Sequence, residues 1–432
     1  MASTTIDMTA STGLDASTGA KPSIDLKPYE DALRNGDMTI ARDELSKILA
    51  DVSKEWGPTD PVDRHNIDLL RRRNDLFEYT IFLRDNYVQH FKGHLDFGSD
   101  KSLQLAKLMI DSAWHEHEKG NSAENGPSVQ LAEEICEKNP DHRQTADVLF
   151  NVHYTRAAAA NETNDIKGCL HHTEGMIKVC SDVGNAAQSH HEFPEIYPAL
   201  AHNERGIALV MNAQYDDGVK MFEASIGLYN GLPDYWAGMD TNPRTNLGFT
   251  LWVTGKPIKA EVCLTSLLKD RVAKFGSDDR ESYRTGRVYH GLGNVYYGAI
   301  DEVSESWHKK ALAQYRDTIG SDHHKTADLC HRVAQHHLRR REFNIARTLI
   351  DQALEVYAKR KLYRPELART TFLKIKLEAE DGNEEAAAKL LQDATEMREK
   401  VLKDRGLPVA PNPDGKPLVE EDFDDLVTFF TR

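Results

Sequence analysis

The stretch RGIALVMNAQYDDGVKMFEASI (residues 205–226) decides the fold, because its spacing returns along the chain. A small residue, Gly206, is followed seven positions later by a turn residue, Ala213, and then by an apolar stretch of helix-forming residues. The same spacing occurs in LGFTLWVTGKPIKAEVCLTSLL (residues 247–268), where Gly248 is the small residue. This arrangement is typical of two helices joined by a tight turn.

Three further copies extend the pattern toward the end of the chain. They are centred on Gly293, Ala334 and, in more degenerate form, Ile375, and the copy at Gly293 is one residue short in its turn. Successive copies are 41 to 45 residues apart. A small residue on each first helix lets the second helix approach closely, and apolar side chains fill the space to the next pair. Five copies in one frame predict an all-α array of antiparallel helix pairs.

These residues resemble the tetratricopeptide repeat, most strongly over residues 198–402. The repeat is longer than the usual length of about 34 residues, and in this it is similar to the kinesin-light-chain-like branch, as is the stretch 311–337. The acidic-aromatic ending VEEDFDDLVTFFTR (residues 419–432) resembles the endings of fungal tetratricopeptide proteins. The resemblance implies a right-handed superhelical solenoid of about six to eight helix pairs.

Composition and pattern divide the chain into four parts. Residues 1–24 have neither a basic start nor an apolar stretch, which argues against a signal peptide and favours a disordered leader. Residues 25–197 are interpreted as a diverged N-terminal helical repeat region, and residues 198–405 as the tetratricopeptide-like array. Residues 406–432 combine a Pro/Gly linker with the acidic-aromatic segment.

Bulk properties exclude several classes of function. The formal net charge of −15 argues against nonspecific nucleic-acid binding, which needs a basic surface. No apolar run approaches the roughly 18 residues that a membrane-spanning helix requires. Five scattered cysteines indicate reduced thiols instead of a disulfide framework. A cytoplasmic protein is therefore expected, with a nuclear location also open.

The stretch DHHKTADLCHRVAQHH (residues 322–337) raises the question of a metal site, because it holds five histidines, a cysteine and two aspartates. Neither CxxC nor HExxH occurs, and of its histidines only His324 and His331 share a helix face, so no metal site is predicted. GFTLWVTGKP (residues 248–257) superficially resembles a phosphate-binding loop, but its glycine spacing is too long and Pro257 replaces the required Ser or Thr. No catalytic residue and no cofactor are assigned.

In the tetratricopeptide family the first helix of each pair lines a concave groove. The residues three before, one after and four after the small residue share one helix face. The residue one helical turn before the first of these lies on the same face. The predicted binding groove carries amide, imidazole, guanidinium and aromatic groups and a single acid; the candidates are Asn203, Trp252, Arg287, His290, Asn294, Tyr297, Asp328, His331, Gln335 and Arg369. Such groups suit a carboxylate or another planar polar ligand.

The leading hypothesis is therefore an intracellular binding scaffold or adaptor that holds an acidic or polar peptide, or a partner protein, in its groove. The alternative is an enzyme or a small-molecule-binding accessory protein, for example of a fungal biosynthetic pathway, whose pocket is enclosed by the solenoid. Self-association of the array is a third possibility, and the sequence leaves the oligomeric state open.

The acidic-aromatic segment itself allows two interpretations. It can cap the array, with Phe423, Leu426 and Phe430 packed against the last repeat, since the ends of solenoids need covering. It can also fold back into the groove as an intramolecular ligand at high effective concentration. The sequence somewhat favours the cap, and both interpretations stay open at this point.

Overall fold

The computed structural model describes residues 28, 44, 47, 103, 106–107, 109–110, 113–114, 117, 126–142, 144–185, 193–232, 238–277, 279, 283–359, 363–409 and 417–432. The expected leader at 1–24 lies outside these residues, as does most of the diverged region before residue 126. The described residues form helices and no strands. None of the described helices is long and apolar enough to cross a membrane.

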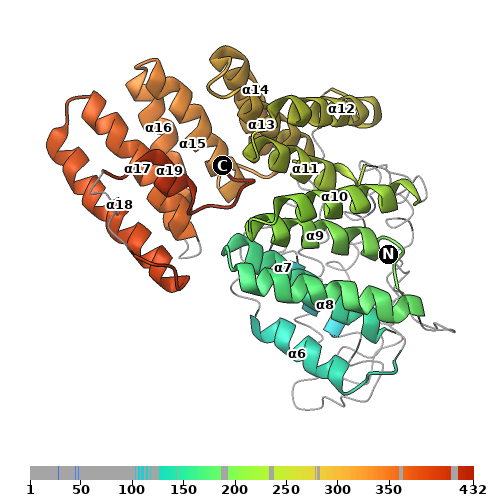
Figure 1. Cartoon of the computed structure of the whole chain (residues 1–432). Helices are drawn as coiled ribbons and strands as arrows, with labels where there is room; N and C mark the ends of the chain where they lie inside the picture. The colour runs from blue at the N-terminus through green and yellow to red at the C-terminus, as the bar shows by residue number, and fades with distance from the viewer. Residues whose placement is uncertain are drawn as a thin grey trace. The chain divides into compact units, whose positions relative to one another are not determined.

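Fourteen helices are described, and Figure 1 shows them following one another along the chain. Their bounds are α6 (Gly126–Glu137), α7 (Thr145–Glu162), α8 (Ile166–Asn185), α9 (Tyr197–Met211), α10 (Tyr215–Asn230), α11 (Thr241–Val253), α12 (Pro257–Phe275), α13 (Arg284–Tyr296), α14 (Asp301–Thr318), α15 (His324–Arg339), α16 (Phe343–Ala358), α17 (Arg364–Glu380), α18 (Glu384–Asp404) and α19 (Glu420–Asp424). The predicted all-α array of paired helices is confirmed.

The chain forms two compact units, and each is described by itself. The first comprises Met1–Ala159, His171–Glu204 and Gly227–Ala237. Its core includes a cluster shared by α6 and α7, and Phe150 stacks on Tyr197 with their ring centroids 3.9 Å apart. The second unit comprises Ala160–Leu170, Arg205–Ile226 and Gly238–Arg432, and it contains four complete helix pairs from α11 to α18.

The turns inside the pairs α11/α12 and α15/α16 are built alike. In the pair α11/α12, Gly255 has a φ of +72° and the Lys256 N–H donates to the Leu251 carbonyl over 2.8 Å. In the pair α15/α16, Arg341 adopts a φ of +60° and the Glu342 N–H donates to the His337 carbonyl over 2.9 Å. A residue in the left-handed conformation, followed by an N–H that donates to the carbonyl five residues earlier, ends a helix while satisfying one of its last carbonyls. These are the turn positions that the repeat pattern predicts.

The small residues of the pattern lie where the two helices of a pair approach most closely. A Cβ atom added at Gly206 would stand 2.6 Å from the Phe222 ring on α10. A Cβ at Gly248 would stand 2.6 Å from Leu264 on α12. Real side chains do not approach one another so closely, so each pair depends on a small residue at this point.

We predict that Gly206→Ala destabilises the fold, whereas the same change at Gly227 stabilises it. The Phe222 ring beside Gly206 is fully buried and has no room to move, so the substitution should lower the free energy of unfolding by about 1–3 kcal/mol. Gly227 lies in helix α10 with open space around its Cα, so alanine there should add roughly 0.5–1 kcal/mol. Urea denaturation followed by circular dichroism measures both. Equal effects at the two sites would contradict the close-packing explanation.

Candidate functional site

Nine of the ten predicted groove residues lie in the second unit, and we call these nine the stripe. Trp252 is on α11; Arg287, His290 and Asn294 are on α13; Tyr297 directly follows α13; Asp328, His331 and Gln335 are on α15; and Arg369 is on α17. The tenth, Asn203, belongs to the first unit, where it is buried on α9 and donates to the Glu204 carboxylate over 2.8 Å. Asn203 is therefore not grouped with the others.

The final residues of the chain are hydrogen-bonded to the stripe. We call residues 417–432, which include α19, the closing segment. Asn294 Nδ2 donates to the main-chain oxygen of Arg432 over 2.7 Å, and Arg369 Nη1 donates to the main-chain oxygen of Thr431 over 2.9 Å. Gln335 Nε2 donates to the Glu420 carboxylate. The stripe thus contributes donors from three different helices to one polypeptide segment.

Aromatic side chains of the closing segment complete this contact. Phe423 is fully buried and stacks on Phe372 of α17, with ring centroids 4.4 Å apart. Phe429 belongs to an apolar cluster with Phe249 of α11, and Phe430 and Trp252 pack against that cluster. The closing segment therefore contacts the last helix pair at one end and α11 at the other.

A chain of hydrogen bonds fixes the orientation of the Asn294 amide. His336 Nε2 lies 2.9 Å from His308 Nδ1, and His308 Nε2 lies 3.1 Å from Asn294 Oδ1. Burial keeps the pKa of His308 well below its usual value, so its ring is neutral and carries one N–H. Asn294 Oδ1 only accepts, so that N–H is on Nε2, and His308 Nδ1 accepts from His336. The Asn294 amide nitrogen is thereby turned toward Arg432.

Gln335 is oriented in a similar way. Arg332 Nη1 donates to Gln335 Oε1 over 2.9 Å, which leaves the amide nitrogen of Gln335 for the Glu420 carboxylate. Both stripe amides thus have a buried donor behind them and a closing-segment acceptor in front. Donors held in one orientation lose less conformational entropy when they bind a ligand.

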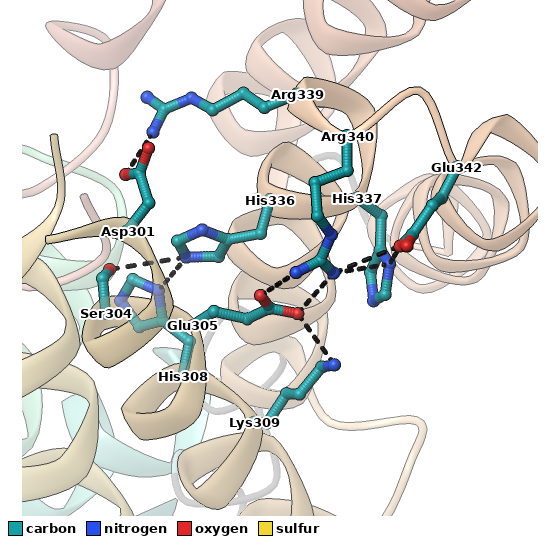
Figure 2. Close-up of polar contacts among 10 residues, drawn as sticks. All are labelled: Asp301, Ser304, Glu305, His308, Lys309, His336, His337, Arg339, Arg340 and Glu342. Atoms are coloured by element: carbon teal, nitrogen blue, oxygen red, sulfur yellow. Dashed lines mark hydrogen bonds and ion pairs between the residues drawn. The ribbon is translucent and has the colours of Figure 1, made fainter.

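Figure 2 shows how α15, which carries His336 and His337, is joined to its neighbour α14. Glu305 on α14 accepts from Lys309 and from Arg340, which directly follows α15. His336 points toward Ser304 and His308, while His337 contacts Glu342. The two histidines therefore take part in helix packing and turn contacts. Within the described part of the chain, no three His, Cys, Asp or Glu residues are grouped so that they could hold a metal ion.

Arg369 carries a buried charge at the centre of the site. Its guanidinium lies 3.4 Å from Asp328 and 3.7 Å from Asp424 of the closing segment. The Tyr357 hydroxyl also donates to Asp328, over 2.6 Å. Burial raises the pKa of Asp328 to about 6, although Arg369 opposes the rise. Burial, together with the nearby Asp328, raises the pKa of Glu366 to about 8. One cation therefore stands among three carboxyl groups, those of Asp328, Asp424 and Glu366.

Two stripe histidines are buried and uncharged. Burial lowers the pKa of His290 and of His331 well below the usual value, and the neighbouring arginines lower both further. His331 Nδ1 lies 3.1 Å from the Thr370 hydroxyl, and the His290 ring meets Phe249 edge-on at 5.4 Å. The Nε2 atom of His331 is buried without a hydrogen-bond partner, whereas the His290 ring also interacts with the main chain of Arg432. The His331 atom can therefore pair with a ligand that brings a suitable donor or acceptor.

Arg287 and Tyr297 interact with neighbouring helices. Arg287 donates to the side-chain oxygens of Asn242 and Asn246 on α11, over 3.2 and 2.8 Å. The Arg339 guanidinium lies 4.1 Å from the centre of the Tyr297 ring, a distance typical of a cation–π contact. Their positions on the stripe follow from the helix periodicity, whereas their contacts do not.

Sequence reasoning missed His308 and Arg332 as parts of the site. His308 occupies the place that Phe222 and Leu264 occupy in other copies. A Cβ atom added at Gly293 would stand 2.1 Å from the His308 ring. A polar residue at an otherwise apolar repeat position was the available signal. Arg332 is buried beside the stripe on α15, at a position the periodicity does not select.

No protein-family model and no curated protein matches the chain. One similar solved structure is the Rap conjugation gene regulator of the plasmid pLS20 in complex with the Phr* peptide; it is 14% identical over 87% of this chain and 94% of the other, with a TM-score of 0.54. A Rap protein complexed with competence and sporulation factor is 12% identical over 94% of each chain, with a TM-score of 0.52. These similarities show a shared tetratricopeptide-like helical fold.

We predict that Glu366→Gln stabilises the protein in a pH-dependent way. The folded state keeps the Glu366 proton up to about pH 8, whereas the unfolded chain loses it near the ordinary pKa of 4.5, so stability falls as the pH rises between these values. Glutamine removes that loss. The free energies of unfolding of variant and wild type should be most similar at pH 5. The advantage of the variant should then grow up to pH 8, by at most about 1.4 kcal/mol per pH unit.

Urea denaturation at pH 5, 7 and 8.5 measures this difference. Glu385→Gln on the exposed side of α18 is the matched control and should leave the pH dependence unchanged. A stability difference at Glu366 that does not vary with pH would contradict the raised pKa.

Proposed function

We propose that the helix pairs from α11 to α18 form a peptide-binding module, and that the stripe holds a polypeptide segment of a partner protein. The observation that carries the proposal is the pair of bonds from Asn294 and Arg369 to main-chain oxygens of the closing segment. Side chains that bind main-chain oxygens can hold many different sequences, because every residue offers a carbonyl. The function is thus binding, and no chemical step is needed to explain these contacts.

The charges near the stripe favour an acidic peptide. Arg369 lies beside Asp424, Lys376 forms an ion pair with Glu420, and Arg398 Nη2 lies 3.9 Å from Asp422. The chain as a whole has a net charge of −15, so this group of cations is a local exception. Local positive potential in an acidic protein selects for ligands of negative charge.

The comparisons lend support of a general kind. Both Rap structures described above were solved with a peptide or a factor bound, and a shared fold makes a related use of this chain reasonable. We further propose that the chain is related to the kinesin-light-chain-like branch, on the basis of its repeat length of 41 to 45 residues, and to fungal members, on the basis of its acidic-aromatic ending. An intracellular adaptor role, in cytoplasm or nucleus, fits the five thiols, none of which forms a disulfide in the described structure.

We predict that Asn294→Ala weakens peptide binding while a matched change elsewhere does not. A random peptide library displayed on phage is selected against the full chain, and enriched peptides are synthesised and titrated. Loss of one main-chain hydrogen bond costs about 1 kcal/mol, so affinity should fall roughly fivefold. Asn344→Ala, on the exposed side of α16, is the control and should leave affinity unchanged.

Gln335→Ala provides a second stripe variant, because Asn294 also contacts His308 and its loss can disturb the packing. Thermal unfolding of each variant shows whether a fall in affinity reflects lost folding. The proposal is wrong if selection enriches no peptide, or if enriched peptides bind the stripe variants and the control equally well.

A further inference from the structure

We infer that the closing segment is the resident ligand of the stripe, and that the partner is an acidic peptide with spaced aromatic residues that displaces it. The inference rests on the proposed function, since it requires the stripe to bind peptides. It adds the chemical class of the partner and a competition that regulates access to the site.

The path of the closing segment exceeds what a cap requires. A cap must cover α17 and α18, and Phe423 and Leu426 pack there with Ala368 and Val401. The segment continues past that end: Arg432 receives the Asn294 bond on α13, and Phe429 packs with Phe249 on α11. The six further residues after Leu426 thus run beyond the last helix pair, and α13, which bonds the final one, already packs against both α12 and α14. This is the course a bound peptide takes.

The closing segment is complementary in charge to the side chains that hold it. It contains five carboxylates between Glu420 and Asp425 and a single arginine, Arg432. Among the described residues, four basic side chains contact it: Arg369, Lys376, Arg398 and Arg405, the last through the Leu426 carbonyl over 2.9 Å. Charge complementarity of this kind selects a partner and speeds its association.

The fit of the closing segment is incomplete. Three buried polar atoms of the described residues along the contact have no hydrogen-bond partner: His331 Nε2, Arg369 Nε and Arg432 Nε. Each such atom costs about 1–3 kcal/mol when it is kept from water and left unpaired. A tethered segment tolerates this cost because its linker keeps it at an effective concentration of about millimolar. A separate peptide that pairs some of these atoms binds more strongly and displaces it.

The contacts also define what the partner must offer. Glu420 meets Gln335 and Lys376, Phe423 stacks on Phe372 three residues later, and Phe429 enters the cluster of Phe249 after six more. A partner peptide therefore carries a carboxylate, an aromatic residue three positions on and a second aromatic residue about nine positions after the carboxylate. Residues between them lie over basic side chains and are acidic or neutral.

The test compares the full chain in its wild-type form with two variants that release the closing segment. F429S/F430S removes the aromatic anchors, and E420K reverses the charge that meets Lys376. The probe is a fluorescein-labelled peptide of residues 417–432, titrated by fluorescence anisotropy. Both released variants should bind the probe at least about tenfold more tightly than the wild type, because the tethered competitor is gone.

A control probe that carries the same two Phe→Ser changes should bind neither form. Adding Asn294→Ala to F429S/F430S should weaken probe binding about fivefold, which locates the probe on the stripe. The inference is overturned if wild type and released variants bind the probe equally, or if the released variants unfold at lower temperature without gaining affinity, as a cap requires.

The outcomes separate this inference from the proposed function. If the released variants ignore the probe but bind library peptides in an Asn294-dependent way, the stripe binds peptides and the assigned partner chemistry is wrong. If neither the probe nor any library peptide binds either form, the proposed function fails and the inference fails with it.

Discussion

Close approach of the two helices in each pair is the constraint on which the rest of the structure depends. Where the first helix has glycine, the partner side chain reaches across: Phe222 over Gly206, Leu264 over Gly248 and His308 over Gly293. The first two contacts are apolar and only hold the pair together. In the third, the same position carries an imidazole that bonds Asn294. A packing position has thereby become the support of the Asn294 side chain.

The buried guanidinium of Arg369 links the array to the closing segment. A buried charge is stable only when its donors are paired, and removing one partner is costly. Arg369 finds an acid on α15, Asp328, and both an acid and a carbonyl on the closing segment. When the segment leaves, the guanidinium regains water or meets a new ligand. The site is therefore more strongly coupled to an acidic occupant than apolar packing alone would make it.

Much of the fold and part of the site can be predicted from the sequence, because local spacing fixes them. Small residues at Gly206, Gly248 and Gly293 mark the helix pairs, and helix periodicity puts His290 and Asn294 on one face. The support of Asn294 by His308 and His336 cannot be derived this way, since it joins three helices. The course of the closing segment depends on contacts between residues far apart in sequence, which no local pattern encodes.

An internal ligand and a structural cap differ in how well their polar atoms are paired. Selection for stability alone removes unpaired buried atoms, because each one lowers the free energy of unfolding. The contact around Arg369 retains several, on the stripe and on the closing segment alike. A segment that must leave cannot be held too tightly, since a competitor has to overcome both its contacts and its tether. A contact that is complementary in charge but leaves some buried polar atoms unpaired meets both requirements: the closing segment is held, and a competitor can still replace it.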